Sequence, residues 1–304
     1  MRNKGVKVLA LTVCLSAFAL FAMGSGSTRE STVDKEIVSA TNSTSSTSTD
    51  NSADTSDNAV TVEQTVLVDQ DNVVITATGM DESVFGPELK LLIENNSDTN
   101  LTFQVRNASV NGYMADTMMS EDVAAGKKSN TEITFTTSGL KECGIDTFAN
   151  MEFSFHIFTT DGWDDYLDTD AITVETSAAA TYTQTIDDSG EVFYDSDGIK
   201  IVGKGLSSDD SIFGPGLIIY IENNSDTDRT VQVRDTSVNG FMIDTVMSQD
   251  VVAGKKAITA VTFLSSSLEE NSITDITSVE TSFHIFDTED WSNEIDTDPI
   301  TVNF

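Results

Sequence analysis

The chain has 304 residues and a formal net charge of −34, from 50 acidic and 16 basic residues. This charge excludes DNA, RNA and anionic lipid as partners of the folded part, because binding such polyanions requires clustered lysine and arginine. Cations, basic proteins and neutral glycans remain as partner classes. The alternative to a specific binding role is that the excess of acidic residues only keeps a secreted protein soluble.

The N-terminus has the three parts of a secretory signal peptide. Basic residues occupy positions 2, 4 and 7, an apolar run covers residues 8–21, and Ala22-Met23-Gly24 forms a small-x-small cleavage site. This pattern predicts a signal peptide over residues 1–24 and an extracellular or cell-surface location. Two alternatives stay open: an uncleaved N-terminal anchor, and a lipid anchor on Cys14.

Residues 25–62 consist mainly of Ser, Thr, Asp, Asn and Glu, with almost no large apolar side chains. Such a segment cannot bury enough apolar surface to offset the entropy lost on ordering. We therefore expect a disordered stalk over residues 25–62.

The rest of the chain is a tandem repeat. Residues 83–174 match residues 211–302 at a constant offset of 128, with blocks such as IENNSDT, SVNG, AGKK and SFHIF present in both copies. Before residue 83 the offset falls to 126, so the second copy has two extra residues near 207–210. These extra residues predict a surface loop, because an insertion within a paired strand would shift its register.

Each copy reads as β structure. Residues 73–78, 89–93, 102–105, 131–135, 151–158 and 172–174 are rich in β-formers, and Asn111-Gly112 is a tight-turn signal. In residues 151–158, Phe153, Phe155 and Ile157 alternate with Ser154, His156 and Phe158, which predicts one buried face. Residues 138–142 and 266–270 could each form one helical turn with Ser138 or Ser266 as its cap.

These patterns predict an all-β protein: two tandem immunoglobulin-like β-sandwich domains after a signal peptide and a disordered stalk. We place the first sandwich at residues 63–175, a linker at residues 176–190 and the second sandwich at residues 191–304.

The order of the blocks FGPxLxLxIENNSD, QVRxxSVNGxM, AGKK, SLxExxI and SFHIF resembles immunoglobulin-like domains of unknown function in exported proteins and lipoproteins of gut Firmicutes. The resemblance covers both copies. It implies the sandwich fold and an exported protein, and it brings no catalytic motif.

Paired aspartates are the candidate metal ligands, because closely spaced carboxylates in loops can coordinate calcium through oxygen. They are Asp69, Asp71, Asp168 and Asp170 in the first copy and Asp195, Asp197, Asp296 and Asp298 in the second. The alternative is that these residues initiate turns and end strands. No cofactor is expected, with calcium as the one candidate.

The aromatic candidates are Trp163 and Trp291, which follow the SFHIF strand among acidic residues. Exposed indoles in polar loops can contact a protein or stack on a sugar ring, and they can equally close the open end of a sandwich. His156 and His284, the chain's two histidines, are expected to be partly buried and hydrogen-bonded across the sheet, with a ligand or acid–base role as the alternative.

Catalysis has little support in the sequence. We find no Gly-x-Ser-x-Gly elbow, and Cys143 aligns with Asn271, so no Cys/His pair occurs in both copies. We therefore expect a non-enzymatic secreted or cell-surface module that binds a protein or glycan at the cell envelope, or that acts as a structural spacer. Two alternatives remain: a calcium-dependent adhesion module, and a hydrolase or accessory domain acting on cell-wall or glycan substrates.

Overall fold

The computed structural model describes residues 60–207 and 213–304. The expected signal peptide, residues 25–59 of the expected stalk and residues 208–210 of the expected loop insertion lie outside these ranges. Within them, no helix is long and apolar enough to cross a membrane.

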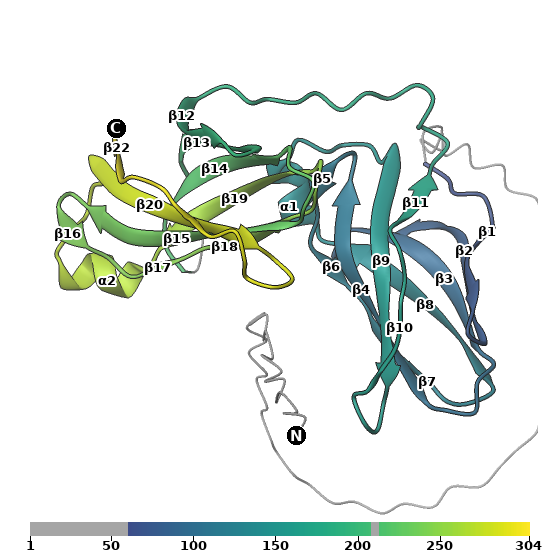
Figure 1. Ribbon diagram of the computed structural model, residues 1–304. Helices are drawn as coiled ribbons and strands as arrows, with labels where there is room; N and C mark the ends of the chain where they lie inside the picture. Colours follow the sequence, from purple (N-terminus) through teal and green to yellow (C-terminus); the bar gives the residue numbers. More distant parts are fainter. Residues whose placement is uncertain (1–59, 208–212) are drawn as a thin grey trace, which may run out of the picture. The chain divides into compact units, whose positions relative to one another are not determined.

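The structure confirms the all-β class (Figure 1). The elements of the first half are β1 (Thr65–Gln70), β2 (Val73–Glu82), β3 (Pro87–Asn95), β4 (Leu101–Val110), β5 (Tyr113–Met114), β6 (Thr117–Met118), β7 (Ser120–Val123), β8 (Lys127–Phe135), α1 (Thr137–Glu142), β9 (Asn150–Thr159), β10 (Asp165–Asp168) and β11 (Ile172–Glu175). Those of the second half are β12 (Glu191–Ser196), β13 (Ile199–Leu206), β14 (Gly216–Asn223), β15 (Arg229–Val238), β16 (Phe241–Met242), β17 (Thr245–Val246), β18 (Ser248–Val251), β19 (Lys256–Phe263), α2 (Ser265–Glu270), β20 (Ser278–Asp287), β21 (Ile295–Asp296) and β22 (Ile300–Asn303).

Both halves use the same pairings. In the first, β1, β2, β3, β8 and β6 form one sheet, while β9 pairs with β4, β10 and β11 in another. In the second, β12, β13, β14 and β19 correspond to the first of these sheets, and β20 pairs with β15, β21 and β22. A single parallel pair, Lys256 with Tyr113, links β19 to β5, and Lys255 Nζ lies 2.7 Å from a Glu152 carboxylate oxygen.

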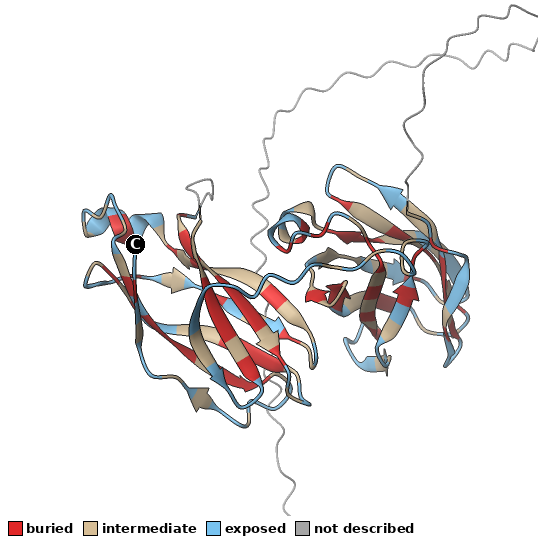
Figure 2. Cartoon of the chain, turned by 90° about the horizontal axis from the view of Figure 1, so that it is seen from above, coloured by how far each residue is buried: buried red, intermediate tan, exposed pale blue. Residues whose placement is uncertain are grey.

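The core follows the alternation in the sequence. Phe153, Phe155 and Ile157 of β9 are buried with residues of β2, β3 and β8, and the equivalent Phe283 and Ile285 of β20 are buried in the second half. Figure 2 colours buried residues red, and they recur along the strands of both halves. The side chains of β9 that point away from this core are thereby placed on an outer surface.

Tight turns form where Asn and Asp accept a positive φ. Asp71 and Asn72 have φ of 50° and 62° between β1 and β2, and Asn111 has φ of 52° before Gly112 between β4 and β5. Such turns match the twist of antiparallel strands. They join β1 to β2 and β4 to β5 in antiparallel register.

The expected serine caps are wrong. Helix α1 follows Thr136 and α2 follows Leu264, and neither residue makes a side-chain cap hydrogen bond. The hydroxyls that begin the helices serve the β2–β3 and β13–β14 connections instead: Thr137 Oγ1 donates to Phe85 O and Ser265 Oγ donates to Phe213 O.

Candidate binding site at the two tryptophan loops

Each copy has an aromatic pair on the outer side of its long strand. His156 and Phe158 of β9 are two residues apart and lie on the face opposite the core residue Ile157. Their ring centroids are 5.2 Å apart, and the same distance separates His284 from Phe286 in β20. Both phenylalanines are 5% exposed, so something must cover them.

The cover comes from the loop after the strand, which we name the first Trp loop (residues 159–165). Thr159 closes this loop by three hydrogen bonds: its N–H donates to Asp164 O, its carbonyl accepts from Trp163 N–H, and its Oγ1 accepts from Asp164 N–H. This closure holds Trp163 at a φ of 59°. A bulky side chain rarely adopts that conformation, which costs about 1–3 kcal/mol.

The strained backbone lays the indole over the phenyl ring. Trp163 stacks on Phe158 with centroids 5.4 Å apart and an interplanar angle of 13°. Even so, Trp163 is 75% exposed, and its counterpart Trp291 is 55% exposed. The indoles therefore do not close the end of a sandwich. They cover an outer sheet face with one ring face and leave most of their surface in water.

The histidines anchor the other end of each stack. His156 Nδ1 lies 2.6 Å from Asp168 Oδ1 on β10, and His284 Nδ1 lies 2.7 Å from Asp296 Oδ1 on β21. The expected partly buried imidazole, hydrogen-bonded across the sheet, is confirmed. On its other side, His156 Nε2 is 3.9 Å from a carboxylate oxygen of Asp165, which belongs to the first Trp loop.

In the second copy, the equivalent loop (residues 287–293, the second Trp loop) is closed around a carboxylate. Asp287 N–H donates to Ser292 O, and Trp291 N–H donates to Asp287 O. Trp291 again has a positive φ, of 61°, and packs on Phe286 at 5.5 Å. The two copies thus reach the same indole placement with different closing residues.

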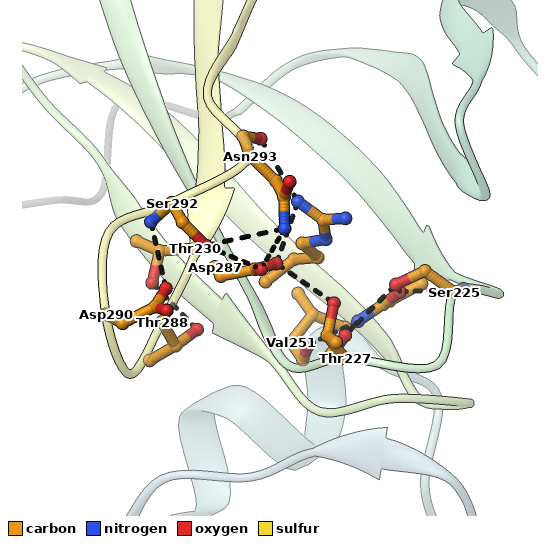
Figure 3. Close-up of polar contacts among 11 residues, drawn as sticks. Ser225, Thr227, Thr230, Val251, Asp287, Thr288, Asp290, Ser292 and Asn293 are labelled. Atoms are coloured by element: carbon orange, nitrogen blue, oxygen red, sulfur yellow. Dashed lines mark hydrogen bonds and ion pairs between the residues drawn. The ribbon is translucent and has the colours of Figure 1, made fainter.

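The closing network of the second Trp loop surrounds Asp287 (Figure 3). Its carboxylate accepts from Asn293 Nδ2, from Thr227 Oγ1 at 2.9 Å and from Ser292 Oγ at 3.1 Å, and it pairs with Arg229 Nη1 at 2.9 Å. The hydrogen bond from Asn293 does most to lower the pKa of the Asp287 carboxyl, with Thr227, Ser292 and the Arg229 charge adding to it.

The Arg229–Asp287 pair belongs to the second copy alone. The aligned residues in the first copy are Leu101 and Thr159. Arg229 and Asp287 are each 9% exposed, and Arg229 Nε has no hydrogen-bond partner. A charged pair therefore replaces an uncharged one at the base of the loop, where it adds bonds from Asn293 and Ser292 that the first loop lacks.

The paired aspartates lie in two separate places in each half. Asp69 and Asp195 are in β1 and β12, while Asp71 and Asp197 form the turns that follow, with φ of 50° and 53°. The Asp71 carbonyl accepts from Tyr166 Oη, and Asp197 Oδ2 accepts from Tyr194 Oη, which lowers the pKa of the Asp197 carboxyl.

At the other place, Asp168 and Asp296 bond to the histidines, and Asp170 and Asp298 are exposed after β10 and β21. In residues 60–207 and 213–304, no three His, Cys, Asp or Glu side chains gather closely enough to hold a metal ion.

One hollow of the described surface, of about 330 Å³, is lined in part by Leu140, Phe148, Asp81, Glu82 and Asp146. All three of its acids are exposed to solvent. Hydrolysis by paired carboxylates uses one acid in its protonated form, usually held so by burial, and this hollow does not bury its carboxyl groups.

Comparison with known proteins adds little. No protein-family model matches the chain, and no curated protein sequence matches it. Among solved structures it is similar to the YadV chaperone, with a TM-score of 0.24 and 10% identity over 77% of this chain and 100% of that one. It is also similar to Salmonella enterica SafA pilin in complex with the SafB chaperone, with a TM-score of 0.20 and 9% identity over 71% and 89%. Likeness at this level supports no further conclusion, and the resemblance to exported immunoglobulin-like domains stays a prediction.

Proposed function

We propose that this chain is a non-enzymatic binding module that contacts a macromolecular partner at the cell envelope through the exposed indoles of its two Trp loops. The signal-like residues 1–24 support export, and the Ser/Thr/Asp-rich residues that follow are suited to a spacer. The module needs no metal or cofactor in this proposal.

One observation carries the proposal: both copies hold a mostly exposed tryptophan in an unfavourable backbone conformation. Trp163 and Trp291 have φ near 60° although the residues that close their loops differ. Covering a phenylalanine does not require this arrangement, because a smaller apolar residue in a relaxed loop would also exclude water. Large, rigid aromatic rings that are largely exposed to solvent are typical of protein contact surfaces.

Duplication adds avidity. Two equivalent sites on one chain turn the second contact into an intramolecular event, so weak single contacts can give useful retention.

The test uses the purified protein on an immobilised panel of envelope glycans and short peptides. The double variant Trp163→Ala/Trp291→Ala is compared with wild type and with Phe85→Ala, which removes an aromatic ring that is 63% exposed elsewhere in the first copy. The proposal expects at least one ligand that wild type and Phe85→Ala retain and that the double variant loses. Equal binding by all three proteins, or turnover of a panel glycan, contradicts it.

A further inference from the structure

The surroundings of each exposed indole restrict the ligand. In the first Trp loop the polar side chains next to Trp163 in the chain are the carboxylates of Asp161, Asp164 and Asp165, all exposed. No lysine or arginine of residues 60–207 or 213–304 forms an ion pair with these three. An ionised carboxylate accepts hydrogen bonds and donates none. The loop therefore offers an aromatic face and three carboxylate acceptors, of which Asp165 has the imidazole of His156 at 3.9 Å.

The second Trp loop is also acidic. Glu289, Asp290 and Glu294 lie close to Trp291 in the chain and are all exposed. The donors that directly follow Trp291, Ser292 Oγ and Asn293 Nδ2, are bonded to Asp287. Its one paired acid, Asp287, is neutralised internally by Arg229. Ser292 N–H donates to Asp290 Oδ1, and the Ser292 side chain does most to lower the pKa of the Asp290 carboxyl, which is therefore charged at neutral pH.

Sugars and cations differ in what they require from such a surface. A sugar hydroxyl both donates and accepts, so sugar sites usually combine donors with acceptors around the ring. A guanidinium or ammonium group only donates. It is also attracted to the face of an aromatic ring, most strongly to tryptophan. An exposed indole with carboxylates close by in its loop matches the cation.

We propose that each Trp loop binds a cationic side chain, an arginine guanidinium or a lysine ammonium, presented by a basic segment of a partner protein. The indole supplies the face on which the cation lies, and the flanking carboxylates accept its N–H groups. This inference rests on the proposed function and specifies the ligand class of the same site.

The charge of the whole chain acts in the same direction. With a net charge of −34, the protein attracts basic segments over distances of about 10 Å at ordinary ionic strength. Long-range attraction alone is not specific, however. Specificity must come from the local indole and its acids, so the experiment has to separate the local contact from the overall field.

The chain allows this separation because its two tryptophans are Trp163 and Trp291. Trp163→Phe and Trp291→Phe each leave one indole as the fluorescent reporter of its own loop. The probes are a peptide of alternating arginine and glycine, the same peptide with the uncharged isostere citrulline, and a neutral chito-oligosaccharide. Each is titrated at low and at physiological salt.

The expected result is a saturable change in the emission of each remaining indole with the arginine peptide, weaker at higher salt. The citrulline peptide should need at least about tenfold higher concentration, because it loses both the charge attraction and the cation–π contact. In the Trp291→Phe background, Asp161→Asn/Asp164→Asn/Asp165→Asn should weaken binding about fivefold.

A matched control removes the same number of charges elsewhere in the first copy, at the exposed residues Glu63, Asp146 and Glu175. Glu63→Gln/Asp146→Asn/Glu175→Gln should change the affinity less than about twofold, because the residual field is nearly the same. Equal losses in the two triple variants would overturn the inference in favour of non-specific attraction. Stronger binding of the oligosaccharide or the citrulline peptide, or no response to any probe at millimolar concentration, would also overturn it. The proposed function is contradicted separately, by its own Trp163→Ala/Trp291→Ala experiment.

Discussion

Replacing Asp287 by threonine, the residue at the aligned position of the first copy, should reveal the cost of the buried Arg229 charge. In Asp287→Thr the guanidinium keeps only the Asn293 carbonyl, at 3.2 Å from Nη1, as an acceptor. Removing one partner of a buried ion pair costs about 3–5 kcal/mol. Arg229→Leu leaves Asp287 with bonds from Asn293, Thr227 and Ser292, so we expect a smaller loss of about 1–3 kcal/mol.

The double variant Arg229→Leu/Asp287→Thr recreates the first copy's pair, Leu101 and Thr159. Because it leaves neither a charge nor a carboxylate unpaired, its free energy of unfolding should fall within about 1 kcal/mol of wild type. The assay is urea unfolding in the Trp163→Phe background, so that Trp291 reports on its own half, with the denaturant slope checked for constancy. With these values the double-mutant cycle should give a coupling of at least about 3 kcal/mol.

Additive single effects, or a double variant less stable than either single variant, would refute this account of the pair.

The contribution of Asp287 to the free energy of unfolding should also depend on pH. The pKa of the Asp287 carboxyl is lowered in the folded protein, so its contribution is complete above the unfolded value near ~4 and is lost as the pH falls through the folded value. The stability difference between wild type and the double variant should therefore shift against wild type in acid.

Three further predictions concern the fold and its reactive group. Asn223 is buried, donates to Thr227 O and Val251 O and accepts from Ser225 N–H. Asn223→Ala should therefore lower the free energy of unfolding by about 2–4 kcal/mol in the same urea assay. A loss below about 1 kcal/mol would contradict this role. A Cβ on Gly86 would lie 1.9 Å from Phe135 O, whereas one on Gly139 of α1 would meet nothing closer than 3.9 Å. Gly86→Ala should therefore lower the melting temperature by several degrees, and Gly139→Ala should leave it unchanged or slightly higher. The reverse order would be inconsistent with this packing. Burial raises the pKa of the Cys143 thiol to about 11, so in a Cys14→Ser chain it should resist alkylation at pH 8 until urea unfolds the protein, and rapid native labelling would show that the thiol is accessible.

The sequence indicated the β class because the buried strands alternate strongly. Phe153, Phe155 and Ile157 of β9 face the core as the period of two requires. The Asn111-Gly112 turn formed because its residues accept positive φ at low cost. Strands such as β10 and β21 lacked this signal because four and two residues are too few to show an alternation, although they pair with β9 and β20.

The sequence predicted only part of the candidate site. Trp163 and Trp291 were found as candidates from their acidic loops, but their exposure depends on the hydrogen bonds of Thr159 and Asp287 and on the stack beneath, which no local pattern encodes. The pairing of His156 with Asp168 had one usable signal, the spacing of 12 residues repeated in His284 and Asp296. The Arg229–Asp287 pair had none, because its members are 58 residues apart and the first copy lacks both.

The two indole N–H signals in a nitrogen–proton NMR spectrum test the central claim most directly, because each reports one Trp loop and the chain contains no other tryptophan. On titration with the arginine–glycine peptide, both signals should move in a saturable way, together with backbone amides of residues 159–165 and 287–293. Fixed indole signals, or amide shifts spread over acidic surface far from these loops, would show that the exposed tryptophans are not where this protein binds.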